Sequence, residues 1–237
     1  GAPNSGSIPF RVLGKAMTSL MLSRPVRTIS SRSIPGAMPP SFASQWLVPR
    51  ISRFSIEHPD IDVRIKAVDF DEGFLEDDVD VAIYYGKGRW SGVKADKLHT
   101  EFLTPLCSPL LFNGPKPLES LSDLRHHVLL HDLSREAWKN WLKSVGVAGV
   151  NVNQGPVFSH SMLVLQAAAL GQGIALGNTI LARPELDAGR LIMPFEEKVA
   201  SRDAFYLVCD EAQAELGKIA AFRAWILAQV EEEQNDL

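Results

Sequence analysis

Residues 40–65, PSFASQWLVPRISRFSIEHPDIDVRI, predict a helix followed by a strand. The first half repeats apolar side chains at helical spacing, on one stripe formed by Phe42, Trp46, Leu47, Ile51 and Phe54. Ser41 stands at an N-cap position, directly after a Pro-Pro pair that disfavours helix before it. Pro49 removes one backbone donor, so we expect the helix to bend there.

The second half of this stretch predicts a strand. His58-Pro59-Asp60 ends the helix, and apolar residues then alternate with polar ones, at Ile61, Val63, Ile65 and Ala67. Strands alternate with helices along the rest of the chain as well. This order is typical of an α/β protein with mostly parallel sheets and helices on their faces. Two such groups fit, one before about Cys107 and one after it.

The other elements follow from the same patterns. Strands are expected at 28–34, 79–85, 98–107, 128–130, 157–158, 174–176, 191–193 and 205–209. Helices are expected after Ser134, after Ser161, around 179–183 and over 212–232. Residues 1–27 begin with GAPNSGS and resemble a poorly ordered tag or linker remnant. The acidic run DFDEGFLEDDVD at 69–80 fits a solvated turn and lacks the ligand spacing of a calcium loop.

Length and composition restrict the class of protein. The chain has 237 residues, 46% of them hydrophobic, and a net charge of −4, which suits one large or two modest globular domains. No apolar run reaches the roughly 18 residues of a membrane span, and no signal peptide is visible. Its two cysteines, Cys107 and Cys209, give no disulfide framework. We therefore expect a cytoplasmic protein, and the absence of a basic stripe argues against nucleic-acid binding by this chain.

Catalytic motifs are missing. The sequence has no P-loop, dinucleotide fingerprint, nucleophile elbow or HExxH. Two cysteines at unrelated positions do not make a zinc site, and no cofactor is expected. A Ser161, His160 and Asp132 triad can be written down, but no motif supports it. We therefore do not expect an enzyme.

Small polar residues at two helix starts are the better candidates for a ligand site. These are Ser41 with Phe42, and Ser159, His160 and Ser161. Free backbone N–H groups at helix starts receive carboxylate or phosphate, and ligands in open α/β sheets bind beyond the carboxyl ends of strands. Ordinary helix capping remains the alternative for each serine. Further candidates at strand ends are Tyr84, Tyr85, Gly86 and His131.

Several long strings resemble the effector-binding domain of LysR-type transcriptional regulators. They are PPSFASQWLVPRISRFSIEHPDIDVRI, DDVDVAIYYGKG, LTPLCSPLL and SHSMLVLQAAALGQGIALG. Together with AFYLVCDEAQAELGKIAAFRAWIL they are most similar to the glycine cleavage activator branch, whose relatives include regulators of β-lactamase expression. The likeness covers residues 40–232.

The resemblance implies two α/β subdomains of the periplasmic-binding-protein type, joined by two crossover strands. Subdomain I would comprise 28–106 and 202–237, and subdomain II 107–201. A small effector would bind in the cleft between them, at the candidates named above and at Phe205. The resemblance also implies a homodimer or tetramer through the helix after Ser41 and the helix after Ser161, with a protein co-regulator as a further possible partner.

Two departures from the family pattern stand out. The helix-turn-helix through which the family binds DNA is absent, so this chain is expected not to recognise DNA by itself. Pro35 and Gly36 also fit a strand interior poorly, where the family has its first strand. Our hypothesis is a regulatory domain that senses glycine or a related small anionic metabolite. The alternative is a solute-binding protein of the same fold, which would need an export signal.

Overall fold

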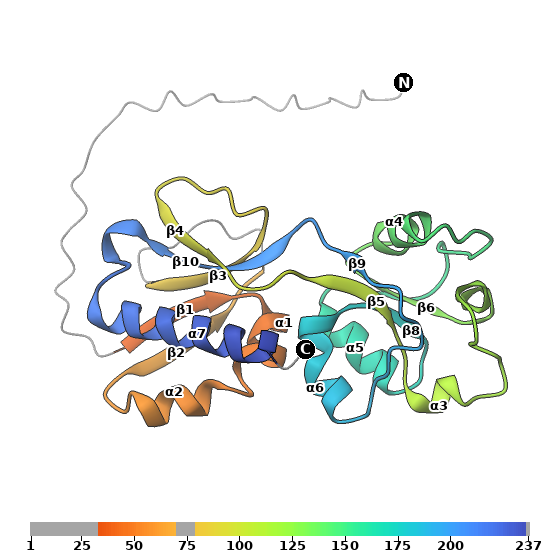
Figure 1. Cartoon of the computed structure of the whole chain (residues 1–237), viewed down its shortest axis with the longest axis horizontal. Helices are drawn as coiled ribbons and strands as arrows, with labels where there is room; N and C mark the ends of the chain where they lie inside the picture. The colour runs from red at the N-terminus through yellow and green to blue at the C-terminus, as the bar shows by residue number, and fades with distance from the viewer. Residues whose placement is uncertain (1–32, 70–78, 236–237) are drawn as a thin grey trace, which may run out of the picture. The chain divides into compact units, whose positions relative to one another are not determined.

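The computed structural model contains two five-stranded sheets, each covered by helices (Figure 1). It describes residues 33–69 and 79–235. The expected tag remnant, most of the 28–34 strand and most of the acidic run at 69–80 lie outside these residues. No helix in the described part of the chain has the length and apolar character of a membrane span.

The first sheet has the strand order β2-β1-β3-β10-β4. Its strands are β1 (Ser33–Met38), β2 (Asp62–Ala67), β3 (Val81–Gly86), β4 (Val93–Lys97) and β10 (Ala204–Asp210). β1 runs parallel to β2 and β3, whereas β10 is antiparallel to β3 and β4. The sheet therefore combines segments from both ends of the described chain.

β1 corrects an expectation from the sequence, because it is a central strand that contains Pro35 and Gly36. The carbonyl of Pro35 accepts a hydrogen bond from the N–H of Asp80 at 2.9 Å, so Pro35 turns its backbone groups toward β3. β3 begins only at Val81, one residue later. The described pairing of β1 with β3 starts at Gly36 and Val81, so the missing N–H of Pro35 falls just before it.

The helix expected over residues 41–57 is divided by Pro49. It consists of α1 (Pro40–Phe42), the π-helical η1 (Ala43–Leu47) and α2 (Ile51–Glu57). The N–H of Val48 bonds the carbonyl of Ala43, five residues back, and the N–H of Arg50 bonds Leu47, three back. Because a proline ring collides with the carbonyl four residues earlier in a regular helix, the wide turn precedes Pro49.

The second sheet has the order β7-β6-β8-β5-β9. Its strands are β5 (Phe102–Leu106), β6 (Leu129–Asp132), β7 (Val157–Phe158), β8 (Ile174–Asn178) and β9 (Val199–Ala200). β6 is parallel to β7 and β8, and β5 is antiparallel to β8 and β9. The strand expected at 191–193 is reduced to a single bridge between Cys107 and Ile192.

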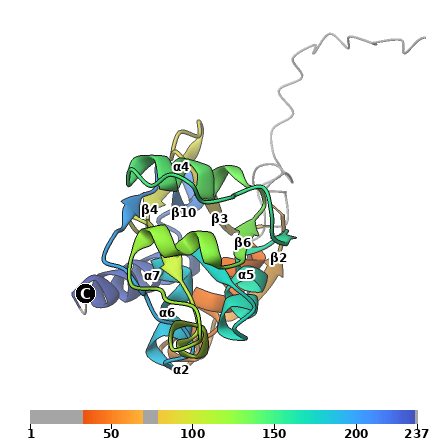
Figure 2. The same cartoon turned by 90° about the vertical axis from the view of Figure 1, so that its right-hand side faces the viewer.

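Helices cover both faces of the second sheet (Figure 2). They are α3 (Pro109–Phe112), η2 (Leu121–His126), α4 (Glu136–Ser144), α5 (Ser161–Ala169) and α6 (Thr179–Asp187). Leu129 and Ile174 face a core with Trp138 and Trp141 of α4. Leu130 and Ala175 face the opposite core, with α5 and α6. This alternation along β6 decides which of its side chains face α4 and which face α5.

The C-terminal helix packs on the first sheet. After the short η3 (Glu211–Gln213), α7 (Gly217–Asn235) buries Ile219, Phe222, Ile226 and Val230. It begins at Gly217, later than the expected 212. Phe54 of α2 contacts the Phe222 ring at a centroid distance of 5.2 Å, which joins the two helices.

Two connections join the sheets. Residues 98–101 lead from β4 to β5, and residues 201–203 lead from β9 to β10. The N–H of Ser201 donates to the carbonyl of Glu101 at 2.8 Å, so the connections are paired where they cross. The α/β fold with two sheets and two crossovers is confirmed.

Candidate ligand-binding site

Ser41 links the helices of the two sheets. Its Oγ accepts a hydrogen bond from the backbone N–H of Met162, in the first turn of α5, at 3.1 Å. Ser41 is therefore not the N-cap of its own helix, where Pro39 takes that position without a side-chain bond. It instead satisfies one of the free donors at the start of α5.

Ser161 and Asp132 form the second polar contact at this helix start. Ser161 Oγ donates a hydrogen bond to Asp132 Oδ2. Burial raises the pKa of Asp132, while the bond from Ser161 and the nearby His160 oppose that rise. The next residue, Leu133, has a φ of 57°, and its N–H donates to Phe158 at 2.8 Å. This conformation is uncommon for a non-glycine residue, and the bond holds the end of β6 beside the end of β7.

His160 joins the same helix start to the end of β2. Its Nδ1 lies 2.7 Å from Ser159 Oγ, and its Nε2 lies 2.9 Å from Asp69 Oδ1. Asp69 follows β2 in the first sheet, so this pair, like that of Ser41 and Met162, spans the two sheets. The structure thus brings Ser41, Ser159, His160 and Ser161 together at the start of α5.

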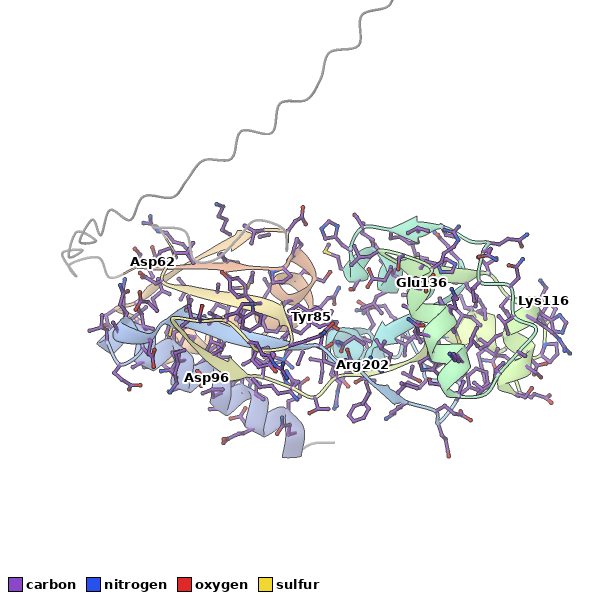
Figure 3. The ribbon with its side chains drawn as sticks, turned by 90° about the horizontal axis from the view of Figure 1, so that it is seen from above. Asp62, Tyr85, Asp96, Lys116, Glu136 and Arg202 are labelled. Atoms are coloured by element: carbon purple, nitrogen blue, oxygen red, sulfur yellow. The ribbon has the colours of Figure 1, made fainter. Side chains whose placement is uncertain are left out.

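Three aromatic side chains, those of Phe42, Phe205 and Tyr85, pack against one another beside Ser41. The ring of Phe205 lies 4.9 Å from both Phe42 and Tyr85, measured between centroids. Phe42 and Phe205 are buried, and Tyr85 is partly exposed. Figure 3 shows Tyr85 at the end of the first sheet that faces the second, near Arg202 of the returning connection. Aromatic surface beside a few fixed polar groups is typical of small-molecule sites.

Other predicted residues lie elsewhere. Tyr84 is on the opposite face of β3 from Tyr85, and its ring lies 5.5 Å from that of Trp90. Gly86 is paired with Ala204 at the end of β3. His131 is fully buried, on the face of β6 away from Ser161, and its Nε2 lies 2.7 Å from the carbonyl oxygen of Gln154. The structure therefore does not place Tyr84 or His131 with the helix-start residues.

A buried carboxyl group, that of Glu101, lies where the two connections between the sheets meet. Glu101 is 1% exposed and accepts a hydrogen bond from the side-chain amide of Asn178, the N-cap of α6. Burial raises the pKa of Glu101 to about 8, although the Tyr85 hydroxyl and the Phe205 backbone act in the opposite direction. Tyr85 Oη also lies 3.2 Å from Ser201 Oγ. These polar contacts involve both sheets and both connections.

Sequence reasoning missed Asp69, Glu101 and Asn178. The sequence offers Asp132 only as a member of an unsupported catalytic triad. Its position at the carboxyl end of β6 is the signal that could have selected it, because this rule already selected Tyr85. Glu101 and Asn178 carry no such signal, since their proximity depends on how the crossovers fold.

The chain belongs to the LysR family of transcriptional regulators. The family's LysR substrate binding domain matches residues 37–231. Over 218 residues the chain is 54% identical to the glycine cleavage system transcriptional activator of Escherichia coli (strain K12), covering 90% of this chain and 72% of that protein. It is 38% identical to the homolog of that activator in Haemophilus influenzae, covering 84% of this chain and 66% of that protein.

The fold has a solved counterpart in the effector domain of the transcriptional regulator AmpR of Pseudomonas aeruginosa. The two share 28% identity with a TM-score of 0.73, over 86% of this chain and 98% of that one. The chain is thus a LysR-type effector-binding domain and a homologue of the glycine cleavage activators. Because its homologues are regulators, the prediction that it is not an enzyme is confirmed.

Proposed function

We propose that this domain senses glycine or a closely related small metabolite, in the cleft at the start of α5. The observation that carries the proposal is the convergence of Ser41, Ser161 and Asp132 on that helix start. The first-turn N–H groups and serine hydroxyls suit a carboxylate. The carboxylate of Asp132 suits an ammonium group. A zwitterionic amino acid carries both groups, a carboxylate and an ammonium, only a few atoms apart.

The effector would compete with a contact that the domain makes with itself. Because the N–H of Met162 already donates to Ser41, a carboxylate takes that donor only when the Ser41 hydroxyl leaves Met162 and turns to donate to the carboxylate itself. Binding would then change the separation of the two sheets around the crossovers at 98–101 and 201–203. A ligand shifts this equilibrium only through a different affinity for the two arrangements.

Calorimetric titration with glycine tests this site. We expect Ser161→Ala and Ser41→Ala to weaken binding about tenfold, the effect of losing about 1.4 kcal/mol. Ser122→Ala is the matched control, because Ser122 is an exposed serine in η2, a different element. Equal affinity in the wild type and in both cleft variants would rule out the assignment.

The proposal includes a homodimer. Ile56 on α2 is 79% exposed, and Leu170, directly after α5, is 68% exposed. A two-fold pair with α2 of one protomer against α5 of the other would bury both surfaces twice. We further propose that the domain works in the cytoplasm, where its relatives would regulate transcription, and that DNA binding is a property of the complete regulator.

A further inference from the structure

A polar groove of about 310 Å³ lies apart from the proposed effector site. It opens between α6, the turn that precedes α2, and the last turns of α7. Its volume falls at the lower end of the range for small-molecule pockets. Three arginines and three acidic residues line it: Arg50, Arg53, Arg183, Asp187, Glu232 and Glu233.

The two walls of the groove belong to different sheets. Arg53 and the α7 residues come from helices on the first sheet, and Arg50 from the turn before α2, whereas Arg183 and Asp187 come from α6 on the second. α6 packs against η1, and Ile180 and Leu181 of α6 share one core with Trp46 and Leu47. A ligand that contacts both walls would stabilise this packing.

Arg50 lines the groove, and several contacts hold its guanidinium in place. Its guanidinium lies 4.9 Å from the centre of the Trp46 ring, and Nη1 donates to the Trp46 carbonyl at 2.8 Å. Nη2 contacts Glu233 Oε1 at 3.3 Å. Glu233 also accepts from Trp46 Nε1 at 2.8 Å and lies 3.2 Å from His99 Nε2. The Glu233 carboxylate is therefore engaged by the protein.

Within the described part of the chain, Arg53 and Arg183 keep donors without a hydrogen-bond partner. The contacts of Arg53 are long, 3.3 Å to Gln229 Oε1 and 3.5 Å to Glu232 Oε2. Arg183 donates through Nε to Asp187 at 2.7 Å, and among the described residues its two terminal nitrogens have no hydrogen-bond partner. A guanidinium has five N–H donors in a planar fork, which matches two oxygens of a carboxylate or phosphate.

Of the three acidic residues in the groove, Glu232 makes the longest contact with its arginine. Arg53 and Glu232 are each 63% exposed, and an exposed pair at 3.5 Å contributes little. An incoming anion can replace Glu232 beside Arg53 at low cost. It would add two-pronged hydrogen bonds that Glu232 does not make.

We propose that this groove is a second ligand site, in which Arg53 and Arg183 bind a small oxyanion, a carboxylate or a phosphate group. Arg50, held by Trp46 and Glu233, acts as a positioning residue beside them. The site shares no lining residue with the cleft at α5. Its occupation favours the packing of α6 against η1 and so acts on the arrangement of the two sheets.

NMR of the arginine Nε–H groups tests the site with inorganic phosphate and, separately, succinate, at constant ionic strength. We expect saturable shifts at Arg53 and Arg183. Arg53→Gln and Arg183→Gln should each weaken binding about tenfold, because charge-assisted hydrogen bonds are lost. Glu232→Gln should tighten binding, since it removes the competing carboxylate. The two anions separate a phosphate site from a carboxylate site.

Arg64→Gln is the matched control, because Arg64 is an exposed arginine on β2 that also contacts a carboxylate, Asp62 Oδ2, at 3.1 Å. It should leave the affinity unchanged, as should Ser161→Ala in the cleft. Shifts that do not saturate, or that are equal in Arg53→Gln, Arg183→Gln and Arg64→Gln, would show a general ionic effect and overturn the proposal. Loss of binding in Ser161→Ala would assign the anion to the cleft instead.

Discussion

Glu101 shows how strongly the fold can raise the pKa of one carboxyl group. It is almost fully buried and accepts from Asn178, and among residues 33–69 and 79–235 it forms no ion pair. Desolvation disfavours its charged form, and nearby Asp203 acts in the same direction against weak help from Lys97. With a pKa of about 8 in the fold, this carboxyl group is mostly neutral at pH 7.

A pH dependence of stability follows from Glu101. Its folded pKa is raised above the unfolded value, so its contribution is complete below about pH 4.5 and is lost as the pH rises through about 8. Glu101→Gln removes the titration, and the amide oxygen can still accept from Asn178. We expect the variant to exceed the wild type by about 2 kcal/mol or more at pH 8 and to match it near pH 4. Urea unfolding at both pH values measures this; parallel curves would contradict it.

Gly88 gives a second prediction at the residue scale. Its φ is 74°, and a Cβ there would lie 2.5 Å from the ring of Tyr206. Gly92 has nearly the same φ, 76°, but nothing lies within 4 Å of its Cβ position. Gly92→Ala should therefore cost about 1 kcal/mol, from backbone strain alone, and Gly88→Ala about 3 kcal/mol. Denaturant unfolding compares them, and equal losses would show that the ring moves aside.

Strand alternation explains which site residues the sequence could place. The sequence identified strand ends and helix starts, and Ser41, Ser159, His160 and Ser161 do lie together. It could not determine the register of short strands. A shift of one residue reverses every side chain, so Tyr84 and His131 could not be distinguished from Tyr85 and Asp132. The ligand role of all these residues stays a prediction.

At the element scale, the end of α7 is fixed by one carboxylate. Burial would raise the pKa of Glu233, but His99, Trp46 and Arg50 outweigh it, and the pKa is lowered. A lowered pKa means that the fold stabilises the charged carboxylate. This contribution to the free energy of unfolding is present above about pH 4.5 and is lost as the pH falls further. The bond to His99 ties α7 to the first crossover.

Glu233→Ala tests this anchor. Removing one partner of a buried charge cluster leaves Arg50 and His99 without their acceptor, so we expect a loss of about 3 kcal/mol in the free energy of unfolding. Glu231→Ala, at an exposed neighbouring position in the same helix, should change it by less than about 0.5 kcal/mol. Similar values for the two variants would mean that the network does not stabilise the helix.

Helices and strands differed in how well the sequence predicted them. Apolar periodicity located α5, α6 and most of α7, because one buried face dominates each pattern. It failed at β1, where Pro35 is tolerated only because β3 starts one residue later, and at Pro49, where a π turn replaces a simple bend. Both outcomes depend on hydrogen-bond partners that are distant in sequence or offset along the helix.

For the whole molecule, the proposed dimer predicts a concentration-dependent sedimentation coefficient. Ile56→Asp and Leu170→Asp should each shift the protein toward the monomer, since each places a charge in a surface that the pairing would bury twice. Leu110→Asp is the control, because Leu110 on α3 is 82% exposed and lies outside the proposed contact. A wild type that sediments as a monomer at every concentration would refute the pairing.

The two-sheet architecture was expected from the strand and helix order together with the family resemblance. Pattern alone left the last strand and helix unassigned, and β10 proves to lie between β3 and β4 in the first sheet. The division at residues 106 and 202 stays a prediction. Long-range strand order has no local signal, so the resemblance supplied what periodicity could not.

A thermal-shift comparison of the wild type with Ser161→Ala tests the central claim most directly, using a panel of amino acids, purines and small carboxylates. A cleft ligand at 100 times its Kd stabilises the fold by about 2.7 kcal/mol, which raises Tm by roughly 5–10 °C for a domain of this size. We predict such a saturable rise for glycine or a close relative in the wild type, and a clearly smaller one in Ser161→Ala. No rise with any compound, or an equal rise in both proteins, would contradict an effector site at the start of α5.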